Sequence, residues 1–447
     1  MKKLNIKSPV AILGYGAEGR AAFDFLKKQG VTDITICDEK DNLMMPAGVH
    51  SRLGEGAFDD LSQFKTIMRS PGIHYELPSI LSAIESGAII TSLTRLALEL
   101  AADHITAITG TNGKTTTTAL TRKILEAHYG DSLIFGGNDG SPVLKEVMEH
   151  PNNPVLMEVS SFQFADLSLS PHISALLNIT PNHLDWHVTL EDYTHAKENL
   201  FRHQNAEDWA VLNANEENST RMAESTSAQI LWVGKQKGKS WAAWKEGTLT
   251  VHHEGKEEGV IRHDQLLVKT HPDNLLFAAA LAALHHVPVS TIAEQMKLFK
   301  GVAHRLEHIR TLNDIHFYND SSSTSPESAM MAIDQFNPKH LILLLGGSSK
   351  KSDFSFLADK IKSHGVRVYL YGQEGETIQT ALREIGAGSS ALTYNTSGNF
   401  SQIIHDVHHL AKAEDNIVLS PACASFDMFT NAKERGTQFT RIVEGLE

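Results

Sequence analysis

Short apolar stretches alternate with longer segments of helical spacing along most of the chain. VAIL at 10–13 and HLILLLGG at 340–347 are typical, since each leads into a polar turn and then a helical pattern. This alternation predicts parallel sheets with helices on both faces, an α/β fold. At 447 residues the chain exceeds the size at which one core stops growing, so we expect two to four domains.

The first strand–helix unit carries a glycine fingerprint. Gly14, Gly16 and Gly19 in VAILGYGAEGRAAFDFL fit G-x-G-x-x-G, and Asp38 ends the next apolar run, DITICD. An acid about 20 residues beyond such glycines is placed for a ribose hydroxyl, and a diphosphate would sit on the helix N-terminus. NAD and a UDP-sugar both present a diphosphate, so the motif leaves these two ligands open, together with a tight turn that binds neither.

A second glycine loop lies in AITGTNGKTTTTAL at 107–120. The run Ile105 to Thr109 predicts a strand, and the segment after the loop predicts a helix that reaches at least to Leu125. The match to the phosphate-loop pattern G-x-x-x-x-G-K-[ST] is partial, because Ile108 stands where the first glycine would be. Lys114 would reach the β- and γ-phosphates, and the Thr115 hydroxyl would bind Mg²⁺.

Further strands are predicted in NPVLMEVSSFQF and ISALLNITPNHLDWH, and a polar stretch at 213–265 precedes the alanine-rich helix LLFAAALAALHH. GVAHRLEHI indicates a domain boundary. Beyond it, HFYNDSSSTSP, HLILLLGGSSKKSDF, VRVYLYGQEGE and NIVLSPACASF each predict a strand that ends in a polar loop. Ligands of such sheets gather at the carboxyl ends of strands, which is where these loops fall.

Composition and charge limit the cellular compartment and the classes of partner that we expect. A net charge of -13 argues against a general nucleic-acid or anionic-membrane binder. Cys37 and Cys423 are the two cysteines, far apart, and we expect both in the core of a protein from a reducing compartment. Neither a signal-peptide pattern nor an uncharged run of 18 residues is present, so we expect a cytoplasmic protein.

Several motifs in one order closely resemble the Mur ligase family. They are GTNGKTT, the glutamate of MEVSSFQF, NITPNHLDWH, the lysine of YTHAKENLF, AHRLEHI, NDSSSTSP and LSPACASFDMFTNAKERGTQF, with SPG at 70–72. The resemblance covers nearly the whole chain. It implies a Rossmann-like UDP-binding domain at 1–92, a central ATP-binding domain with a phosphate loop and a parallel or mixed sheet at 93–300, and a Rossmann-like amino-acid-binding domain at 301–447.

The resemblance also implies an activity, and the pattern is closest to the members that add D-glutamate. These members join D-glutamate to UDP-N-acetylmuramoyl-L-alanine in the synthesis of peptidoglycan precursors, at the expense of ATP. The γ-phosphate passes to the substrate carboxylate, and the amine attacks the acyl phosphate. The expected partners are therefore small-molecule substrates, with no nucleic acid and no membrane, and we expect a monomer.

By this resemblance four residues form the catalytic centre with Lys114 and two Mg²⁺ ions. Thr115 and Glu158 would bind the first ion. His183 would serve the second, although oxygen donors suit Mg²⁺ better and Asp185 and His187 are neighbouring alternatives. Lys197 would carry a carbamate made from CO₂, which turns a cation into a metal-bridging anion; the alternative is an exposed lysine on a helix.

The remaining site residues fall into three groups by the ligand that the resemblance implies. ATP would be bound by Gly110, Thr111, Asn112, Gly113, Lys114, Thr115, Thr116, Asn274, Arg305 and Asp320. The UDP substrate would be bound by Gly14, Gly16, Gly19, Asp38, Glu39, Ser70, Gly72 and Asn138. D-Glutamate would be bound by Thr324, Lys350, Ser425 and Phe426.

Two positions depart from the family pattern. Phe277 replaces a usual asparagine, so either Asn274 contacts adenine alone or Phe277 stacks on the base. Ser322 replaces a common lysine, which makes Lys350 more important and Lys351 a candidate substitute. Three alternatives stay open: a related ligase for another amino acid, a nucleotide-binding partner subunit without activity, and an NAD-dependent oxidoreductase.

Overall fold

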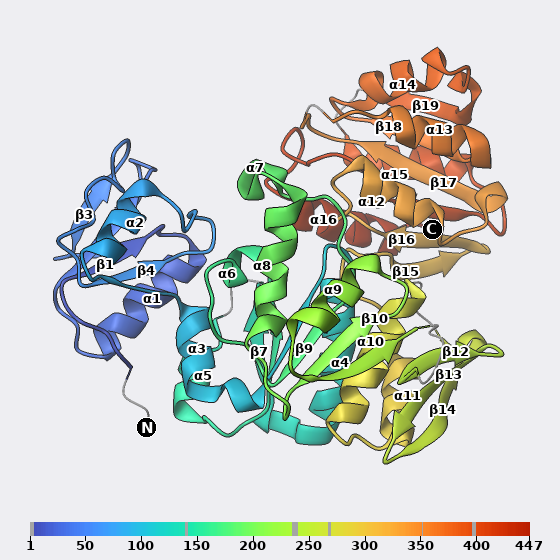
Figure 1. Ribbon diagram of the computed structural model, residues 1–447. Coiled ribbons are helices and arrows are strands. Elements are labelled where there is room, and N and C mark those ends of the chain that lie inside the picture. The colour runs from blue at the N-terminus through green and yellow to red at the C-terminus, as the bar shows by residue number, and fades with distance from the viewer. Residues whose placement is uncertain (1–3, 139–141, 235–239, 267–269, 351, 396–398) are drawn as a thin grey trace. The chain divides into compact units, whose positions relative to one another are not determined.

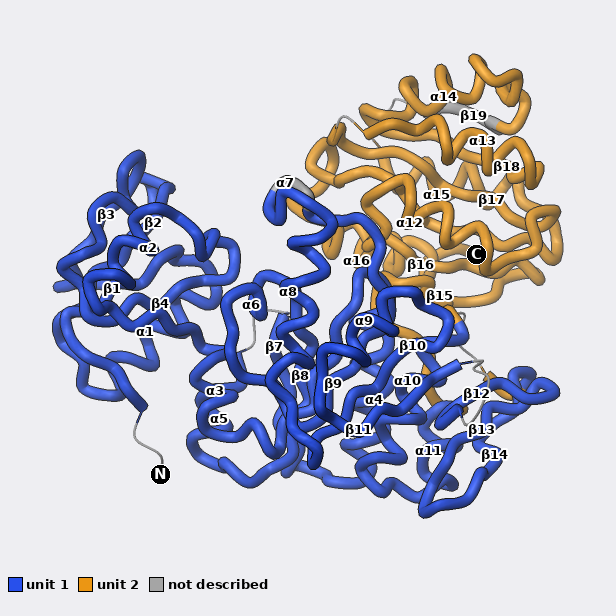
Figure 2. The backbone as a smooth tube through the Cα atoms, viewed as in Figure 1, with its two compact units in different colours: residues 1–264, 272–296 blue, residues 265–271, 297–447 orange. Residues whose placement is uncertain are grey.

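The computed structural model describes residues 4–138, 142–234, 240–266, 270–350, 352–395 and 399–447. The chain forms two compact units, residues 1–264 with 272–296 and residues 265–271 with 297–447 (Figure 2). The described residues contain three sheets, the first two in the first unit (Figure 1). Strands and helices alternate as the apolar pattern predicts, so the α/β fold is confirmed.

The first sheet is parallel throughout, in the order β3-β2-β1-β4-β5. Its elements are β1 (Val10–Leu13), α1 (Ala17–Lys28), β2 (Ile34–Asp38), β3 (His50–Leu53), β4 (Thr66–Arg69), α2 (Pro78–Glu85) and β5 (Ile89–Thr91). The strand order reverses at β1 and β4, so the loops after these two strands flank the crevice where doubly wound sheets bind ligands.

The second sheet has the order β14-β13-β12-β11-β10-β9-β6-β8-β7. Its strands are β6 (Ile105–Thr109), β7 (Ile134–Gly137), β8 (Val155–Glu158), β9 (Ile173–Leu176), β10 (Trp209–Asn213), β11 (Gln229–Val233), β12 (Ala242–Lys245), β13 (Thr248–His253) and β14 (Lys256–Arg262). Its helices are α3 (Leu93–Ala101), α4 (Lys114–Tyr129), α5 (Leu144–Glu149), α6 (Ser161–Phe164), α7 (Leu184–His187), α8 (Leu190–Arg202), α9 (Glu217–Ser225), α10 (Pro272–Leu284) and α11 (Val289–Leu298).

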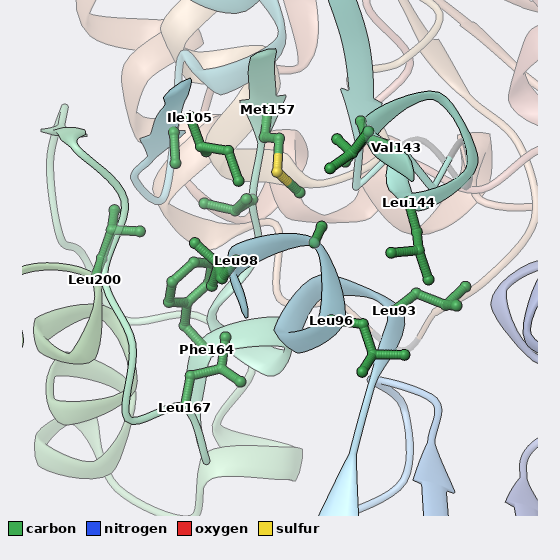
Figure 3. Close-up of a cluster of buried hydrophobic side chains, with 14 of the residues drawn as sticks. Leu93, Leu96, Leu98, Ile105, Val143, Leu144, Met157, Phe164, Leu167 and Leu200 are labelled. Atoms are coloured by element: carbon green, nitrogen blue, oxygen red, sulfur yellow. The ribbon is translucent and has the colours of Figure 1, made fainter. Parts of the chain in front are cut away.

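Helix α3 lies within the core of the first unit. Leu93, Leu96 and Leu98 from α3 belong to one buried cluster with Ile105 of β6 and Met157 of β8 (Figure 3). The side chain of Ser92 caps α3 by accepting from the Arg95 amide at 3.1 Å. Burial of leucines at this spacing, at about 1.5–3 kcal/mol each, anchors the helix beside the strands that end at the phosphate loop.

The third sheet forms the second unit, in the order β15-β16-β20-β17-β18-β19. Its strands are β15 (Glu307–Leu312), β16 (Ile315–Asn319), β17 (Leu341–Gly346), β18 (Arg367–Tyr371), β19 (Ala391–Asn395) and β20 (Asn416–Leu419). Its helices are α12 (Pro326–Ile333), α13 (Ser355–His364), α14 (Gly375–Glu384), α15 (Phe400–Leu410) and α16 (Ala432–Glu444). β16, β20 and β17 are adjacent and parallel, so their carboxyl ends meet at one edge.

The prediction of parallel sheets is incomplete at two places. The polar stretch at 213–265 holds β11 to β14, of which β12, β13 and β14 form an antiparallel meander, and β15 is antiparallel to β16. β13 alternates between buried and half-buried positions, as one-sided burial requires. In the part of the chain that the structure describes, every helix is too short or too polar to cross a membrane.

Candidate active site

The loop between β6 and α4 folds as a turn that ends on a helix N-terminus. Gly113 has a left-handed backbone (φ +83°), and a Cβ on it would lie 2.3 Å from the amide oxygen of Asn274. Asn178 holds the other side, since its backbone and side-chain oxygens accept from the amides of Thr111 at 2.9 Å and Asn112 at 2.8 Å. The first N–H groups of α4 lack helical partners, as an anion site requires.

Two lysines meet at this loop. The Nζ atom of Lys114 donates to the carbonyls of Gly110 and Thr111, both at 2.9 Å. The Nζ atom of Lys197, from α8, donates to the same Gly110 carbonyl at 3.1 Å and to the Thr109 hydroxyl at 3.2 Å. Tertiary folding therefore gathers two amino groups at one carbonyl beside a predicted triphosphate site.

Lys197 is a buried amine. Its side chain is 2% exposed, and its Nζ atom lies 4.6 Å from the centre of the Tyr193 ring. Burial lowers the pKa of Lys197 well below its usual value, and the charge of Lys114 lowers it further. The alternative of an exposed lysine on this helix is therefore wrong, and a lysine with a depressed pKa reacts readily as a free amine.

Glu158 ends β8 next to the same loop. Its Oε1 atom lies 3.4 Å from the Thr115 hydroxyl and accepts from the side-chain amide of Asn138 at 3.1 Å. The side chain of Glu158 is 9% exposed. A hydroxyl and a carboxylate are oxygen donors of the kind that Mg²⁺ prefers, so Thr115 and Glu158 fit the ion in donor chemistry. Asn138, predicted as a contact to the UDP substrate, also orients this carboxylate.

His183 and His187 differ in exposure. His183 is an exposed residue with a left-handed backbone (φ +55°) just before α7, and its ring lies 4.9 Å from that of Phe162. His187 is buried, bonded to the Ser161 hydroxyl at 2.8 Å, and its pKa is lowered to about 4 chiefly by burial. The side chain of Asp185 lies outside the described residues. No group of three or more His, Cys, Asp or Glu side chains suited to a metal occurs among the residues described.

Helix α10 carries Asn274 and Phe277, the two residues considered for contact with adenine. Asn274 is 8% exposed and its side-chain oxygen accepts from the Thr117 hydroxyl at 3.2 Å, directly behind the phosphate loop. Phe277, one turn along the same helix, is fully buried in the core. The alternative that Phe277 stacks on adenine is therefore wrong, because its ring is packed against the interior.

The first sheet builds its own crevice. Ser70, directly after β4, donates its hydroxyl to the Gly14 carbonyl at 2.8 Å, which joins the loops after the two central strands. A Cβ on Gly19 would lie 1.9 Å from that same carbonyl, so the third glycine permits close packing of α1 on β1. Gly16 is exposed at the start of α1 and has open space around it.

Asp38 helps to shape this crevice. Its Oδ2 atom accepts from the Tyr15 amide at 2.6 Å, and its Oδ1 atom accepts from the Lys40 amide at 2.9 Å. Glu39 beside it is exposed. The acid is thus at the end of β2 as the fingerprint predicts, and it also fixes the glycine turn.

Sequence reasoning missed a buried ion pair next to this crevice. Arg69, the last residue of β4, is 2% exposed and forms a salt bridge to Asp166 at 2.5 Å. Its guanidinium also donates to the carbonyls of Ser70 at 3.5 Å, Pro71 at 3.3 Å and Ile73 at 2.8 Å. An arginine directly before SPG was the available signal, but Asp166 is 97 residues away.

The carbonyl of Gly72 is bonded by Trp186 of α7. The indole Nε1 donates to the Gly72 carbonyl at 3.2 Å, and the indole ring lies 4.5 Å from the ring of His74. Glu18 in the first turn of α1 accepts from the side-chain amide of Gln163 at 3.1 Å. Burial raises the pKa of Glu18 to about 7, against the opposing effects of Gln163 and Arg69.

In the second unit the predicted amino-acid site converges at the edge shared by β16, β20 and β17. Lys350, after β17, donates its Nζ atom to the hydroxyl of Thr324 at 3.1 Å and to its carbonyl at 3.2 Å. Ser425 is 2% exposed, whereas Phe426 beside it is 72% exposed. Lys351 lies outside the described residues.

Asp320 lies deep in this edge. Its carboxylate accepts from the hydroxyls of Ser323 at 2.5 Å and Ser420 at 2.7 Å and from the Leu306 amide at 3.2 Å. Burial raises its pKa to about 6. Through Ser323 and Ser420 it joins the loops that follow β16 and β20. Its contact with ATP stays a prediction. Arg305 lies close enough to oppose this pKa shift electrostatically.

Three family models match consecutive parts of the chain. They are described as Mur ligase MurD-like, N-terminal domain, at residues 8–92; Mur ligase middle domain, at 108–282; and Mur ligase, glutamate ligase domain, at 304–423.

Curated relatives match over full length. The UDP-N-acetylmuramoylalanine–D-glutamate ligase of Acetivibrio thermocellus is 33% identical, over 100% of this chain and 98% of the relative. The ligase of the same name from Symbiobacterium thermophilum is 32% identical over 100% of both.

Solved structures match in fold. UDP-N-acetylmuramate-alanine ligase from Thermotoga maritima has a TM-score of 0.58 at 17% identity, over 98% of this chain and 99% of that one. MurF from Acinetobacter baumannii has a TM-score of 0.61 at 15% identity, over 94% of this chain and 88% of that one. Full-length likeness to the curated ligases, together with matches to all three family models, shows that the chain belongs to the Mur ligase family.

Proposed function

We propose that this chain is an ATP-dependent ligase that adds D-glutamate to UDP-N-acetylmuramoyl-L-alanine in peptidoglycan precursor synthesis. The observation that carries the proposal is full-length likeness, at 33% identity, to a ligase named for these two substrates. The amino group of Lys114 at the phosphate loop supports the ATP-dependent part, because a transferring phosphoryl group requires positive charge at its oxygens.

The chemistry has two steps. The γ-phosphoryl group of ATP passes to an oxygen of the substrate carboxylate, which makes that oxygen a good leaving group. The amine of D-glutamate then attacks the carbonyl carbon, the C–N bond forms, and phosphate leaves with the carboxylate oxygen. The work of the protein is to align three anionic partners, and the Lys114 ammonium is positioned to offset their charge.

Thr115 and Glu158 are the residues we assign to Mg²⁺. Bound there, the ion would neutralise charge on the phosphates. His183 is assigned to a second ion by the resemblance alone. Its exposure leaves its ring accessible, whereas the buried bond of His187 to Ser161 makes His187 a poorer candidate.

We further propose that Lys197 is carbamylated in the active enzyme. Its low exposure and depressed pKa favour the neutral amine, which attacks CO₂ to form an N–C bond and loses a proton to give the carbamate anion. Conversion to an anion would also place a negative charge beside the Lys114 ammonium, which shares the Gly110 carbonyl with Lys197.

Carbon-13 NMR tests the carbamate without an activity readout. Protein equilibrated with ¹³C-bicarbonate should show a carbamate carbonyl signal that disappears in Lys197→Ala and persists in Lys145→Ala. Lys145 is a suitable control because its side chain is 61% exposed on α5. A wild-type spectrum without the signal, at a pH where the enzyme is active, contradicts the assignment.

For the UDP group we propose the crevice between β1 and β4. Gly14, Ser70 and the open start of α1 at Gly16 support this, in a chain whose second glycine loop already serves ATP. Calorimetry should show binding of the UDP-muramoyl ligand and no comparable binding of NADH. Tighter binding of NADH would favour the oxidoreductase alternative.

For D-glutamate we propose Lys350, Thr324, Ser425 and the backbone near Phe426. A charge-assisted contact is worth about 1.5–3 kcal/mol, so Lys350→Ala should raise the KM for D-glutamate roughly ten- to a hundredfold and that for ATP far less. Lys412→Ala, exposed in the same unit, is the control. An unchanged KM for D-glutamate in Lys350→Ala would refute this assignment.

We propose three domains, 1–92, 93–300 and 301–447, with limits supported by the ranges of the three family models. We also infer a cytoplasmic monomer, because both cysteines are free and buried and the substrates are small molecules. Light scattering after gel filtration would detect an oligomer, and cell fractionation would test the compartment.

One assay separates the remaining alternatives. The protein is incubated with the UDP-muramoyl acceptor, ATP, Mg²⁺ and a panel of amino acids, and the products are weighed. We expect one product, carrying D-glutamate, with phosphate released only when both substrates are present. Another amino acid in the product favours a related ligase, and binding of ATP without phosphate release favours an inactive partner subunit.

A further inference from the structure

Arg435, on α16, is a buried arginine bonded to two loops. Its side chain is fully buried. Its Nε atom donates to the Ser321 hydroxyl at 3.0 Å, and its Nη2 atom donates to the carbonyls of Ser321 at 3.0 Å and Cys423 at 3.1 Å. Its Nη1 atom donates to the Ala424 carbonyl at 3.1 Å. One rigid guanidinium thus spans the loop after β16 and the loop after β20.

These partners are uncharged. Among the described residues no ion pair of Arg435 occurs, although a buried cation is costly unless it is well compensated. Carbonyl oxygens offset part of the cost, and each would be a buried acceptor without its present donor if Arg435 were removed. The planar guanidinium offers five donors in a fixed geometry, which a lysine ammonium would not reproduce.

Both loops lead to the proposed amino-acid site. Ser321 is three residues before Thr324, which accepts from Lys350, and Ala424 directly precedes Ser425 and Phe426. The Ala424 carbonyl also accepts from the Ser348 amide at 2.9 Å. The loop after β17, which carries Lys350, is thereby tied to the segment that Arg435 holds.

Close packing restricts how far the Arg435 guanidinium can move. A Cβ on Gly347 would lie 3.0 Å from Nη1 of Arg435 and 2.1 Å from the Ala424 carbonyl, so glycine allows the three loops to approach. Gly347 also has a positive φ of +137°. The loop after β17 is therefore packed closely against both the Ala424 carbonyl and the Arg435 guanidinium.

We infer that Arg435 is a positioning residue for the amino-acid substrate, which sets the separation of the loops after β16 and β20. The inference rests on the proposed function for the role of those loops. Arg435 and Lys350 both lower the pKa of the Cys423 thiol electrostatically, so both cations act on the loop after β20, in a chain where Ser322 stands in place of a common lysine. The acids Glu374 and Asp427 lie near Cys423 as well, so this charge offsets groups that would repel a dicarboxylate.

Arg435→Lys tests the inference, because it keeps the charge and loses the planar fork. We expect the KM for D-glutamate to rise about tenfold or more, from loss of one or two charge-assisted hydrogen bonds to the loops. The KM for ATP should change less than about twofold on the same basis. Arg367→Lys is the matched control, since Arg367 pairs with Asp415 at the amino end of β18.

Hydrogen exchange gives a second readout that does not require activity. In Arg435→Lys the amides of 321–324 and 424–426 should exchange faster than in wild type, while they should be unchanged in Arg367→Lys. Should Arg435→Lys fail to fold, Ser321→Ala removes one acceptor and should raise the KM for D-glutamate about threefold, in line with a modest hydrogen bond.

Equal increases in both KM values, or unchanged exchange in these loops, would overturn the inference. A wild-type enzyme that uses another amino acid refutes the proposed function instead. In that case the KM for the amino acid actually used, measured in Arg435→Lys, decides whether the loops are positioned as inferred.

Discussion

The turn after β1 and the loop after β6 are both built from a strand, a glycine turn and a helix N-terminus, yet they offer different charges to a ligand. The first turn of α1 contains Glu18 and follows the exposed Gly16, and the Asp38 carboxylate accepts from the Tyr15 amide in the preceding turn. The first turn of α4 has no acidic residue, begins with Lys114 and receives Lys197 from α8. The same local fold can therefore serve two phosphate ligands of different charge.

Glycine has a different purpose in each. In the first turn Gly19 allows close approach, because a Cβ would meet the Gly14 carbonyl. In the second loop Gly113 supplies a left-handed backbone at the helix start in addition to close approach, since a Cβ on it would lie 2.3 Å from the Asn274 amide oxygen. Motif matching treats these glycines alike, but packing decides which of them tolerates substitution.

The largest expected effect is at the second loop. Lys197→Ala should lower kcat about a hundredfold or more, the scale of losing a positioned charge at a phosphoryl-transfer site. Formate or acetate should restore part of the rate if the charge required is negative. Lys145→Ala is the control. Near-normal turnover of Lys197→Ala would show that the reaction does not require a charged group from Lys197.

Gly19→Ala tests the packing role of the first turn. The new Cβ would lie 1.9 Å from the Gly14 carbonyl, and overpacking of this kind costs about 1–3 kcal/mol or more. Denaturant unfolding should show this loss, whereas Gly16→Ala, with open space around it, should stay within about 0.5 kcal/mol of wild type. Equal stabilities of the two variants would contradict the distinction between these glycines.

Glu18→Gln tests the acid at the first turn. Burial raises the folded-state pKa of Glu18 from 4.5 to about 7, so the native state binds an extra proton between these values and loses stability as pH rises through them. This loss of folding stability is complete above about pH 7 and absent below about pH 4.5.

Glutamine keeps an acceptor for Gln163, so Glu18→Gln should be more stable than wild type by about 1–2 kcal/mol at pH 8, after allowance for partial exposure. The advantage should vanish near pH 4.5. Unfolding free energies measured from pH 4.5 to 8 check this, and an advantage independent of pH would assign the effect to packing.

The smallest effect concerns the tie between the first crevice and α7. Trp186→Phe removes the indole N–H that donates to the Gly72 carbonyl but keeps an aromatic ring near His74. Loss of about 1 kcal/mol should raise the KM for the UDP substrate severalfold and leave that for ATP unchanged. Equal changes in both would mean that Trp186 supports the second loop as well.

Much of this organisation could be predicted because it is local in sequence. The strand, turn and helix of each glycine loop follow from patterns within about 20 residues. The antiparallel meander at 242–262 was missed because its strands carry histidine, lysine and glutamate, and because β14 has four exposed residues at its start. The role of Phe277 stayed open between two alternatives, because it depends on which face of α10 meets the core.

By itself the sequence determined the α/β fold, the two glycine loops and the family, because propensity, periodicity and motif spacing act over short stretches of chain. Only the tertiary structure decided that Lys197 and Lys114 share a carbonyl, that Arg69 pairs with Asp166, and that Arg435 holds two loops. Each of these links joins different elements of the fold. Burial and charge at such contacts depend on how distant segments pack together, and local sequence patterns do not show this packing.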